Sequence, residues 1–242
     1  MTYCVGMLLK DGLVMLSDSR TNAGVDNIAT FRKMTVWEKP GERVMAIMSS
    51  GNLAITQAVT TMLDEGMGGE ANETIVQAPS MFAAAQMVGK AVRSVYSEVD
   101  GELEQKDPGL FNVSFLLGGQ IKGRRCRLFQ VYAAGNFIHA SELTPFFQIG
   151  EHKYGKPILD RALGFDTDLR RAAKLALISM DSTLRSNLSV GMPLDLMIYR
   201  TDALKVELRR TIDEDDKYFR EIRQGWSTSL RNALASLPDV PW

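Results

Sequence analysis

Thr2 is the residue with the clearest potential for nucleophilic chemistry in this sequence. A threonine hydroxyl becomes a useful nucleophile only when a base removes its proton. The α-amine of a terminal threonine is such a base, with an unperturbed pKa of roughly 7.7–8.0. Because Met1 precedes a small residue, we expect it to be removed, which leaves the Thr2 amine free. Most chains that begin Met-Thr make no such use of the threonine, so the following residues decide the interpretation.

A β-hairpin is predicted directly after Thr2. Two apolar runs flank the turn sequence Lys10-Asp11-Gly12. Asp-Gly between such runs favours a tight turn, since glycine tolerates the positive φ that the turn requires. The returning strand would bring Asp18 back beside Thr2.

Lys33 is the candidate for a second basic group. It opens a predicted strand, Lys33 to Trp37. A lone lysine at a strand edge is usually solvated, but here Phe31 and Met34 frame it. Arg32 is the competing candidate, although a guanidinium group stays charged and cannot share a proton near neutral pH.

Gly51 lies where a strand gives way to a helix, predicted from Leu53 to about Leu63. Ser49, Ser50 and Asn52 surround it, and serine and asparagine can cap a helix start. Glycine lets the backbone approach a ligand closely, and N–H groups at a helix start bind negative charge. On spacing alone, Gly51 could equally be the end of a strand.

Several stretches together resemble the proteasome β-subunit family. Residues 2–20 resemble the start of a mature subunit, and Phe31–Met34 resembles the segment that carries the active-site lysine. Ser49–Ala54 resembles the glycine turn, and Met180–Asp195 resembles the late turn and the strand after it. The absent propeptide and the extended C-terminus most resemble the bacterial ancestral-β-subunit-like branch, called Anbu.

The resemblance implies an α+β fold, the four-layer αββα sandwich of N-terminal-nucleophile hydrolases, with an extra C-terminal helix. One domain would span residues 1–242, with a core at 2–210 and a helix and tail at 211–242 that suit a subunit contact. The resemblance also implies assembly into a ring or open helical ring of about a dozen subunits. Whether an ATPase partner exists stays open.

The resemblance further implies a threonine-type peptidase or amidohydrolase that needs no metal or organic cofactor. Thr2 would attack the amide carbonyl, Asp18 would orient Lys33, and the Gly51 N–H would stabilise the oxyanion. Asp181 and Ser186 would support the Thr2 amine, and Thr21 and Ala23 would contact the peptide or amide substrate.

One departure from the family pattern concerns Glu151. It lies where proteasome subunits usually place a serine beside the terminal threonine, and it could replace the hydrogen bonds of that serine. Two alternatives therefore stay open: a selective hydrolase of a small amide or peptide-like metabolite, and a weakly active self-assembling scaffold.

Composition limits the other function classes. The 242 residues are 45% hydrophobic and 24% charged, which is ordinary for one globular domain. A net charge of −1 gives no electrostatic case for nucleic acid or an anionic membrane. The cysteines Cys4 and Cys126 form no disulfide framework, and we identify no signal peptide or membrane span. Cytoplasm is the expected location.

The rest of the chain is assigned by pattern. A loop is predicted over Thr21–Thr30, a helix over Ser80–Val99 and a charged linker over Gly101–Gly109. Asp166 or Thr167 would cap a helix from Leu169 to about Asp181, and turn residues would follow to Asn187. A final hairpin is predicted over Leu194–Arg200 and Lys205–Arg210. Thr211 and Glu214 match a capping box that would start a helix over about 215–235.

Overall fold

The structure is a computed structural model, and it describes residues 2–23, 27–66, 73–98 and 112–242. The predicted linker Gly101–Gly109 and the removable Met1 lie outside the described residues. None of the helices in the described part of the chain combines the length and the apolar character needed to span a membrane.

The N-terminal hairpin belongs to a five-stranded antiparallel sheet, which we call the first sheet. Its order is β10-β1-β2-β11-β12, with β1 (Tyr3–Leu9), β2 (Gly12–Asp18), β10 (Phe146–Gly150), β11 (Leu194–Arg200) and β12 (Leu208–Ile212). The predicted turn is confirmed: Leu9 pairs with Gly12, whose φ is 151°. Cys4 pairs with Ser17, so the strand ends carrying Thr2 and Asp18 lie side by side.

A second five-stranded antiparallel sheet has the order β5-β6-β7-β8-β9. Its strands are β5 (Met34–Lys39), β6 (Arg43–Gly51), β7 (Val113–Ile121), β8 (Arg127–Val131) and β9 (Phe137–His139). Helix α1 (Leu53–Glu65) follows β6 directly, and η1 (Ile75–Gln77) and α2 (Met81–Glu98) come next. The side chain of Asn52 caps α1 by accepting hydrogen bonds from the Ala54 and Ile55 N–H groups, as its residue type predicts.

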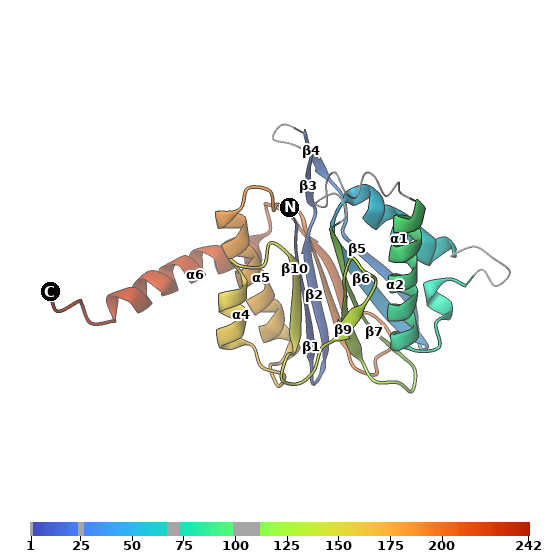
Figure 1. Cartoon of the computed structure of the whole chain (residues 1–242). Coiled ribbons are helices and arrows are strands. Elements are labelled where there is room, and N and C mark those ends of the chain that lie inside the picture. Colours follow the sequence, from blue (N-terminus) through green and yellow to red (C-terminus); the bar gives the residue numbers. More distant parts are fainter. Residues whose placement is uncertain (1, 24–26, 67–72, 99–111) are drawn as a thin grey trace.

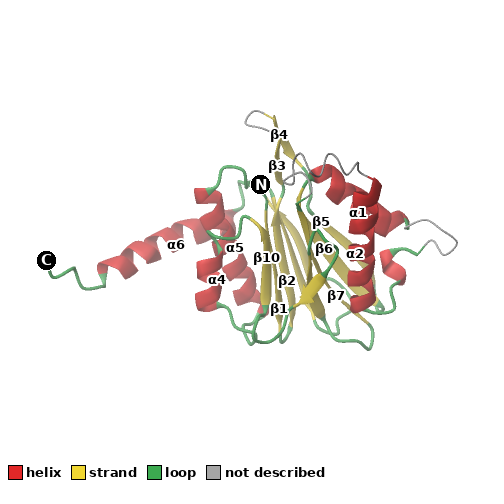
Figure 2. Cartoon of the chain, viewed as in Figure 1, coloured by secondary structure: helices red, strands yellow, loops and turns green. Residues whose placement is uncertain are grey.

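The two sheets face each other, and helices cover their outer faces (Figures 1 and 2). Helices α1 and α2 lie on the second sheet, whereas α4 (Lys156–Ala162) and α5 (Leu169–Ser186) lie on the first. Clusters of buried apolar side chains fill the space between each sheet and its helices and the space between the two sheets. Residues from both sheets, among them Met15, Met48 and Leu116, form the cluster between them. The protein therefore has a mixed α+β fold.

Helix α6 (Lys217–Ala235) projects away from the two sheets (Figure 1). Its bounds confirm the helix predicted over about 215–235, and the side chain of Asp216 caps it by accepting a hydrogen bond from the Phe219 N–H. The predicted capping box is wrong: Thr211 belongs to β12, and its hydroxyl donates to Asp195 at 2.9 Å. Thr211 and Ile212, which the capping-box pattern assigned to a helix start, instead pair with strand β11.

Two further boundaries differ from the prediction. The predicted loop at 21–30 contains a small antiparallel hairpin, β3 (Arg20–Ala23) and β4 (Asn27–Thr30), because these short polar segments pair with each other. Helix α5 is capped by Asp168, not by Asp166 or Thr167, and it continues through the predicted turn to Ser186.

Candidate active site

Thr2 lies at the start of β1 and is 8% exposed. Its carbonyl oxygen accepts a hydrogen bond of 2.7 Å from the Glu151 N–H. Gly150, with a φ of 82°, passes so close that an added Cβ would lie 2.0 Å from the Thr2 carbonyl oxygen. The end of strand β10 therefore fixes the backbone at Thr2. Residue 150 has to be glycine, because there is no space for a side chain.

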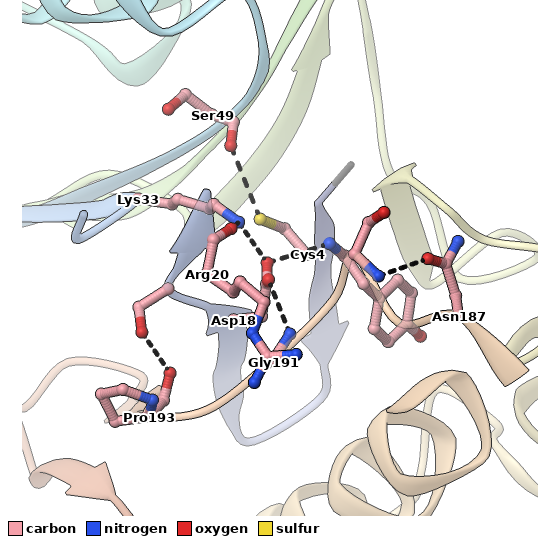
Figure 3. Close-up of polar contacts among 11 residues, drawn as sticks. Cys4, Asp18, Arg20, Lys33, Ser49, Asn187, Gly191 and Pro193 are labelled. Carbon is pink, nitrogen blue, oxygen red and sulfur yellow. Dashed lines mark hydrogen bonds and ion pairs between the residues drawn. The ribbon is translucent and has the colours of Figure 1, made fainter. Parts of the chain in front are cut away.

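Next to Thr2, Asp18 and Lys33 form a buried ion pair (Figure 3). The Lys33 Nζ lies 2.7 Å from the Asp18 Oδ1 and also donates to the Arg20 carbonyl at 2.6 Å. The two residues are 8% and 0% exposed, respectively. Arg32, the competing candidate, is exposed.

Backbone N–H groups hold the Asp18 carboxylate from two directions. Tyr3 N–H donates to Oδ1 at 3.0 Å, and Gly191 N–H donates to Oδ2 at 3.2 Å. Burial away from water raises the pKa of Asp18 above its usual value, whereas Lys33 and the two N–H groups act in the opposite direction. The result is a carboxylate with a fixed orientation that holds the Lys33 ammonium near Thr2.

Two cavities flank Thr2, and Ser50 and Gly51 line both of them. We call the larger one the Lys33-side cavity; its volume is about 570 Å³ and Lys33 and Thr21 also line it. The smaller one, about 390 Å³, reaches Gly150 and Gln148 and is called the Gly150-side cavity. A bound amide could therefore extend to both sides of the Thr2 hydroxyl.

Gly51 ends β6 with a φ of 110°, a conformation that side chains rarely adopt. An added Cβ there would lie 1.9 Å from the Asn112 carbonyl oxygen. The backbone conformation therefore requires glycine at position 51, and this residue lines both cavities.

Glu151 is placed beside Thr2, where the sequence puts it in place of a serine. Its carboxylate accepts a hydrogen bond of 3.0 Å from the Asn187 Nδ2, and Lys153 lies 3.6 Å away. The Asn187 side chain is directed towards the N-terminal strand (Figure 3). Glu151 and Asn187 are both buried, so this hydrogen bond is shielded from solvent.

The other predicted residues divide into two groups. Thr21 lines the Lys33-side cavity, and Ala23 lies in β3 with a side chain outside the described part of the structure. Asp181 and Ser186 line neither cavity, and within the described residues none of their side-chain contacts is with Thr2. Asp181 instead binds Arg223 of α6 at 2.7 Å, and Ser186 is exposed at the end of α5.

Sequence reasoning missed the Arg20 carbonyl and the Gly191 N–H, which hold the ion pair through backbone atoms, and the side chain of Asn187. Backbone contacts leave no residue-type signal. Asn187 does have a residue-type signal, because asparagine is among the residues found at helix ends, and it is the C-cap of the 18-residue helix α5.

Comparison with known proteins agrees with this geometry. No protein-family model matches the sequence, and no curated protein matches it. Solved structures do match. Anbu (ancestral beta-subunit) from Yersinia bercovieri is 49% identical with a TM-score of 0.91, and a Gly-1 mutant of Anbu from Hyphomicrobium sp. strain MC1 is 51% identical with a TM-score of 0.92; each match covers 100% of both chains. A helical assembly of the Anbu complex from Pseudomonas aeruginosa is 47% identical with a TM-score of 0.92, over 99% of this chain and 98% of that one.

The mixed α+β fold, with a threonine at the head of a central strand beside a buried lysine–aspartate pair, defines a proteasome-like protein of the N-terminal-nucleophile hydrolase class. At about half identity over the full length, the chain belongs to the Anbu (ancestral beta-subunit) family.

Proposed function

We propose that this protein is an N-terminal threonine hydrolase that cleaves amide bonds, with Thr2 as the nucleophile after removal of Met1. The observation that carries the proposal is the buried Lys33–Asp18 ion pair, 2.7 Å long, at a cavity that Thr2 lines. Burying two charges is costly and does not usually stabilise a protein, so such a pair beside a nucleophile favours a role in chemistry.

The reaction begins with proton transfer inside one residue. The Thr2 α-amine takes the proton from Oγ, and Oγ forms a bond with the carbonyl carbon of the substrate. The amine then passes the proton to the leaving nitrogen as the C–N bond breaks. Water, deprotonated by the same amine, hydrolyses the resulting ester and releases Thr2.

Lys33 lowers the barrier to deprotonation, because its positive charge stabilises the developing alkoxide. Asp18 orients that charge. The Gly51 N–H is our candidate donor to the oxyanion, a contact worth roughly 2.7–4 kcal/mol in other acyl-transfer enzymes. Thr21 and Ala23, on β3, are candidates for binding the substrate backbone.

We infer that Glu151 and Asn187 take the role that the family resemblance implied for Asp181 and Ser186. Their hydrogen bond of 3.0 Å lies beside the backbone of Thr2, which Glu151 also holds through its N–H. We infer that this pair positions the terminal amine.

We infer that the layers are those of the αββα sandwich of N-terminal-nucleophile hydrolases and that residues 1–242 form a single domain. The chain would also self-assemble, as the related Pseudomonas aeruginosa protein does in its helical assembly. Large apolar side chains exposed on α6 and the tail support a subunit contact there: Tyr218, Leu230, Leu234, Leu237, Val240 and Trp242. Assembly into a ring or an open helical ring of about a dozen subunits would bury these apolar side chains.

The test is intact mass spectrometry before and after incubation with a peptide epoxyketone, which reacts with a threonine that has a free α-amine. We expect a protein that lacks Met1 to gain one adduct. Thr2→Ala should gain none, and Thr228→Ala, an exposed threonine on α6, should react like the parent protein.

Retention of Met1 would exclude the free-amine mechanism in that preparation. Loss of Met1 without any adduct would favour a scaffold. Selective turnover of small amides without cleavage of proteins would identify a dedicated metabolite hydrolase in place of a general peptidase.

A further inference from the structure

The Lys33-side cavity has an unusual lining. One face of α1 forms its wall with residues spaced three and four apart, which is the repeat of a single helix face: Leu53, Thr56, Gln57, Thr60 and Thr61. The opposite face of α1 packs into the core through Ile55, Val59 and Leu63. The helix thus turns its apolar side to the core and a largely polar side to the cavity.

Polar side chains dominate the whole cavity. Thirteen residues line it, six of them threonines and two of them serines, and Leu53 is the one with a large apolar side chain. A pocket for an apolar substrate group is usually lined mainly by hydrophobic residues. An apolar group here would take water away from hydroxyl and amide groups without replacing their hydrogen bonds, which costs free energy.

The charges in the cavity have one sign. Arg32 and Lys33 line it, and no carboxylate is among the described lining residues. Lys33 is balanced by Asp18. Arg32 is exposed and, within the described residues, has no ion pair or side-chain hydrogen bond. Its guanidinium group is therefore available to a ligand, and it matches the two oxygens of a carboxylate.

Two of the α1 hydroxyl groups that line the cavity already donate to the backbone of the helix. Thr56 Oγ1 donates to the Leu53 carbonyl at 3.0 Å, and Thr60 Oγ1 donates to the Thr56 carbonyl at 2.8 Å. These two hydroxyls offer lone pairs to the cavity. Other hydroxyl groups of the lining and the side-chain amide of Gln57 can donate to a ligand, but Arg32 is the charged donor that is not already paired within the described residues.

We propose that the Lys33-side cavity selects substrates in which the residue that supplies the scissile carbonyl has a carboxylate side chain, and that Arg32 is the residue that determines this specificity. The inference rests on the proposed function, because it places the carbonyl at Thr2. The side chain beside that carbonyl takes the larger cavity, about 570 Å³, and the leaving amine departs through the Gly150-side cavity, about 390 Å³.

The test compares fluorogenic peptide amides that differ only in the residue before the leaving group: glutamate, glutamine, leucine or lysine. With protein that lacks Met1, kcat/KM should be highest for glutamate, by on the order of tenfold over leucine and more over lysine. The preference should decrease at high salt, since Arg32 is exposed. Arg32→Ala should remove most of the advantage of glutamate over glutamine, and Arg32→Glu should make lysine the better substrate.

The matched control is Arg125→Ala. Arg125 is also exposed and lines a separate cavity, away from Thr2, so its loss removes the same charge from another place. It should leave the order of substrates unchanged.

The outcomes separate the two proposals. If an epoxyketone labels Thr2 but leucine or lysine is the best substrate, or Arg32→Ala leaves the order unchanged, the specificity proposal is wrong and the hydrolase proposal stands. Equal rates for glutamate and glutamine would exclude the charge of Arg32 as the determinant. If protein without Met1 gives neither adduct nor turnover with any of these compounds, both proposals fail.

Discussion

The hydroxyl group of Tyr3 lies 2.6 Å from the hydroxyl group of Ser179, which connects the residue after Thr2 to helix α5. Ser179 in turn donates to the Gly155 carbonyl at 3.0 Å, and the Gln148 side chain donates to the Tyr3 hydroxyl. The strand that carries the nucleophile is thus held by a buried hydrogen-bond chain that ends in the helical layer.

Tyr3→Phe should lower the free energy of unfolding by about 1–3 kcal/mol, because the buried Ser179 and the half-buried Gln148 lose their shared partner. Tyr218→Phe is the control, since Tyr218 is exposed on α6 and should change stability little. Urea unfolding followed by circular dichroism measures both. Equal effects of the two substitutions would contradict the role of this chain.

Lys33→Ala should be among the most destabilising single changes, by about 3–5 kcal/mol, because it leaves the Asp18 carboxylate buried without a counterion. The double variant Asp18→Asn/Lys33→Met should recover much of this stability but form no adduct with an epoxyketone. Lys156→Ala breaks an exposed pair with Asp160 and should cost less than about 1 kcal/mol. A double variant that still reacts at the parent rate would show that the pair is structural.

Gly51→Ala should destabilise the protein and abolish reactivity at Thr2, because the new Cβ would collide with the Asn112 carbonyl. Gly41→Ala gives the matched comparison: Gly41 has a φ of 76° with nothing within 4 Å of an added Cβ. That change should cost only the roughly 1–2 kcal/mol of a left-handed residue. Thermal unfolding and the rate of adduct formation distinguish the two glycines.

Stability should fall at alkaline pH because of the two free thiols, Cys4 and Cys126. Burial raises the pKa of Cys4, and it raises that of Cys126 to about 12. A thiol whose pKa is raised in the folded state stabilises the protein below the unfolded pKa of roughly 8.5, and this contribution is lost as the pH rises.

For Cys4 the slope of unfolding free energy against pH should approach about 1.4 kcal/mol per pH unit once the unfolded thiol is ionised. Cys4→Ala should make the slope shallower between pH 8.5 and 10, a range set by the reference pKa values of cysteine and tyrosine, about 8.5 and 10. Val5→Ala, a core truncation on the same strand, should lower stability at every pH without changing the slope. Parallel slopes in all three proteins would rule out this contribution.

Arg223→Ala should weaken the attachment of α6, because Arg223 lies 2.7 Å from the buried Asp181 carboxylate. Arg185 approaches the other oxygen of Asp181 at 3.4 Å, so we expect a partial loss of about 1–3 kcal/mol. The assembled fraction, measured by light scattering after size exclusion, should decrease. Arg231→Ala, on the exposed part of the same helix, should keep the packing of α6 intact, and an equal loss of assembly in both variants would contradict the role of Asp181.

Much of the site could be predicted from local sequence. Asp-Gly fixes the hairpin, the hairpin places Asp18 beside Thr2, and the family resemblance identifies Lys33 over Arg32. The structure confirms the hairpin and places Lys33 against Asp18, and the hairpin could be predicted because its signal lies in residues close together in the chain. Gly191 could not be found in this way, since it reaches Asp18 through its backbone from 173 positions away.

Asp181 shows the opposite failure. Aspartate followed by serine and threonine is typical of a turn, and that pattern predicted the end of α5 too early. In the structure a charge from α6, 42 positions later, compensates this carboxylate inside the helix. Local propensity cannot include a partner that only the tertiary fold supplies. The same applies to Thr211, where pairing with β11 replaced the expected helix start.

The bond between Gly191 and Asp18 also bears on how the protein is made. The N-terminal strand leaves the ribosome long before residue 191 is synthesised, so the Asp18 carboxylate that pairs with Lys33 gains the Gly191 N–H only when most of the chain is present. The complete set of contacts to Asp18 therefore forms only after translation has passed residue 191 and that segment has folded against the N-terminal hairpin.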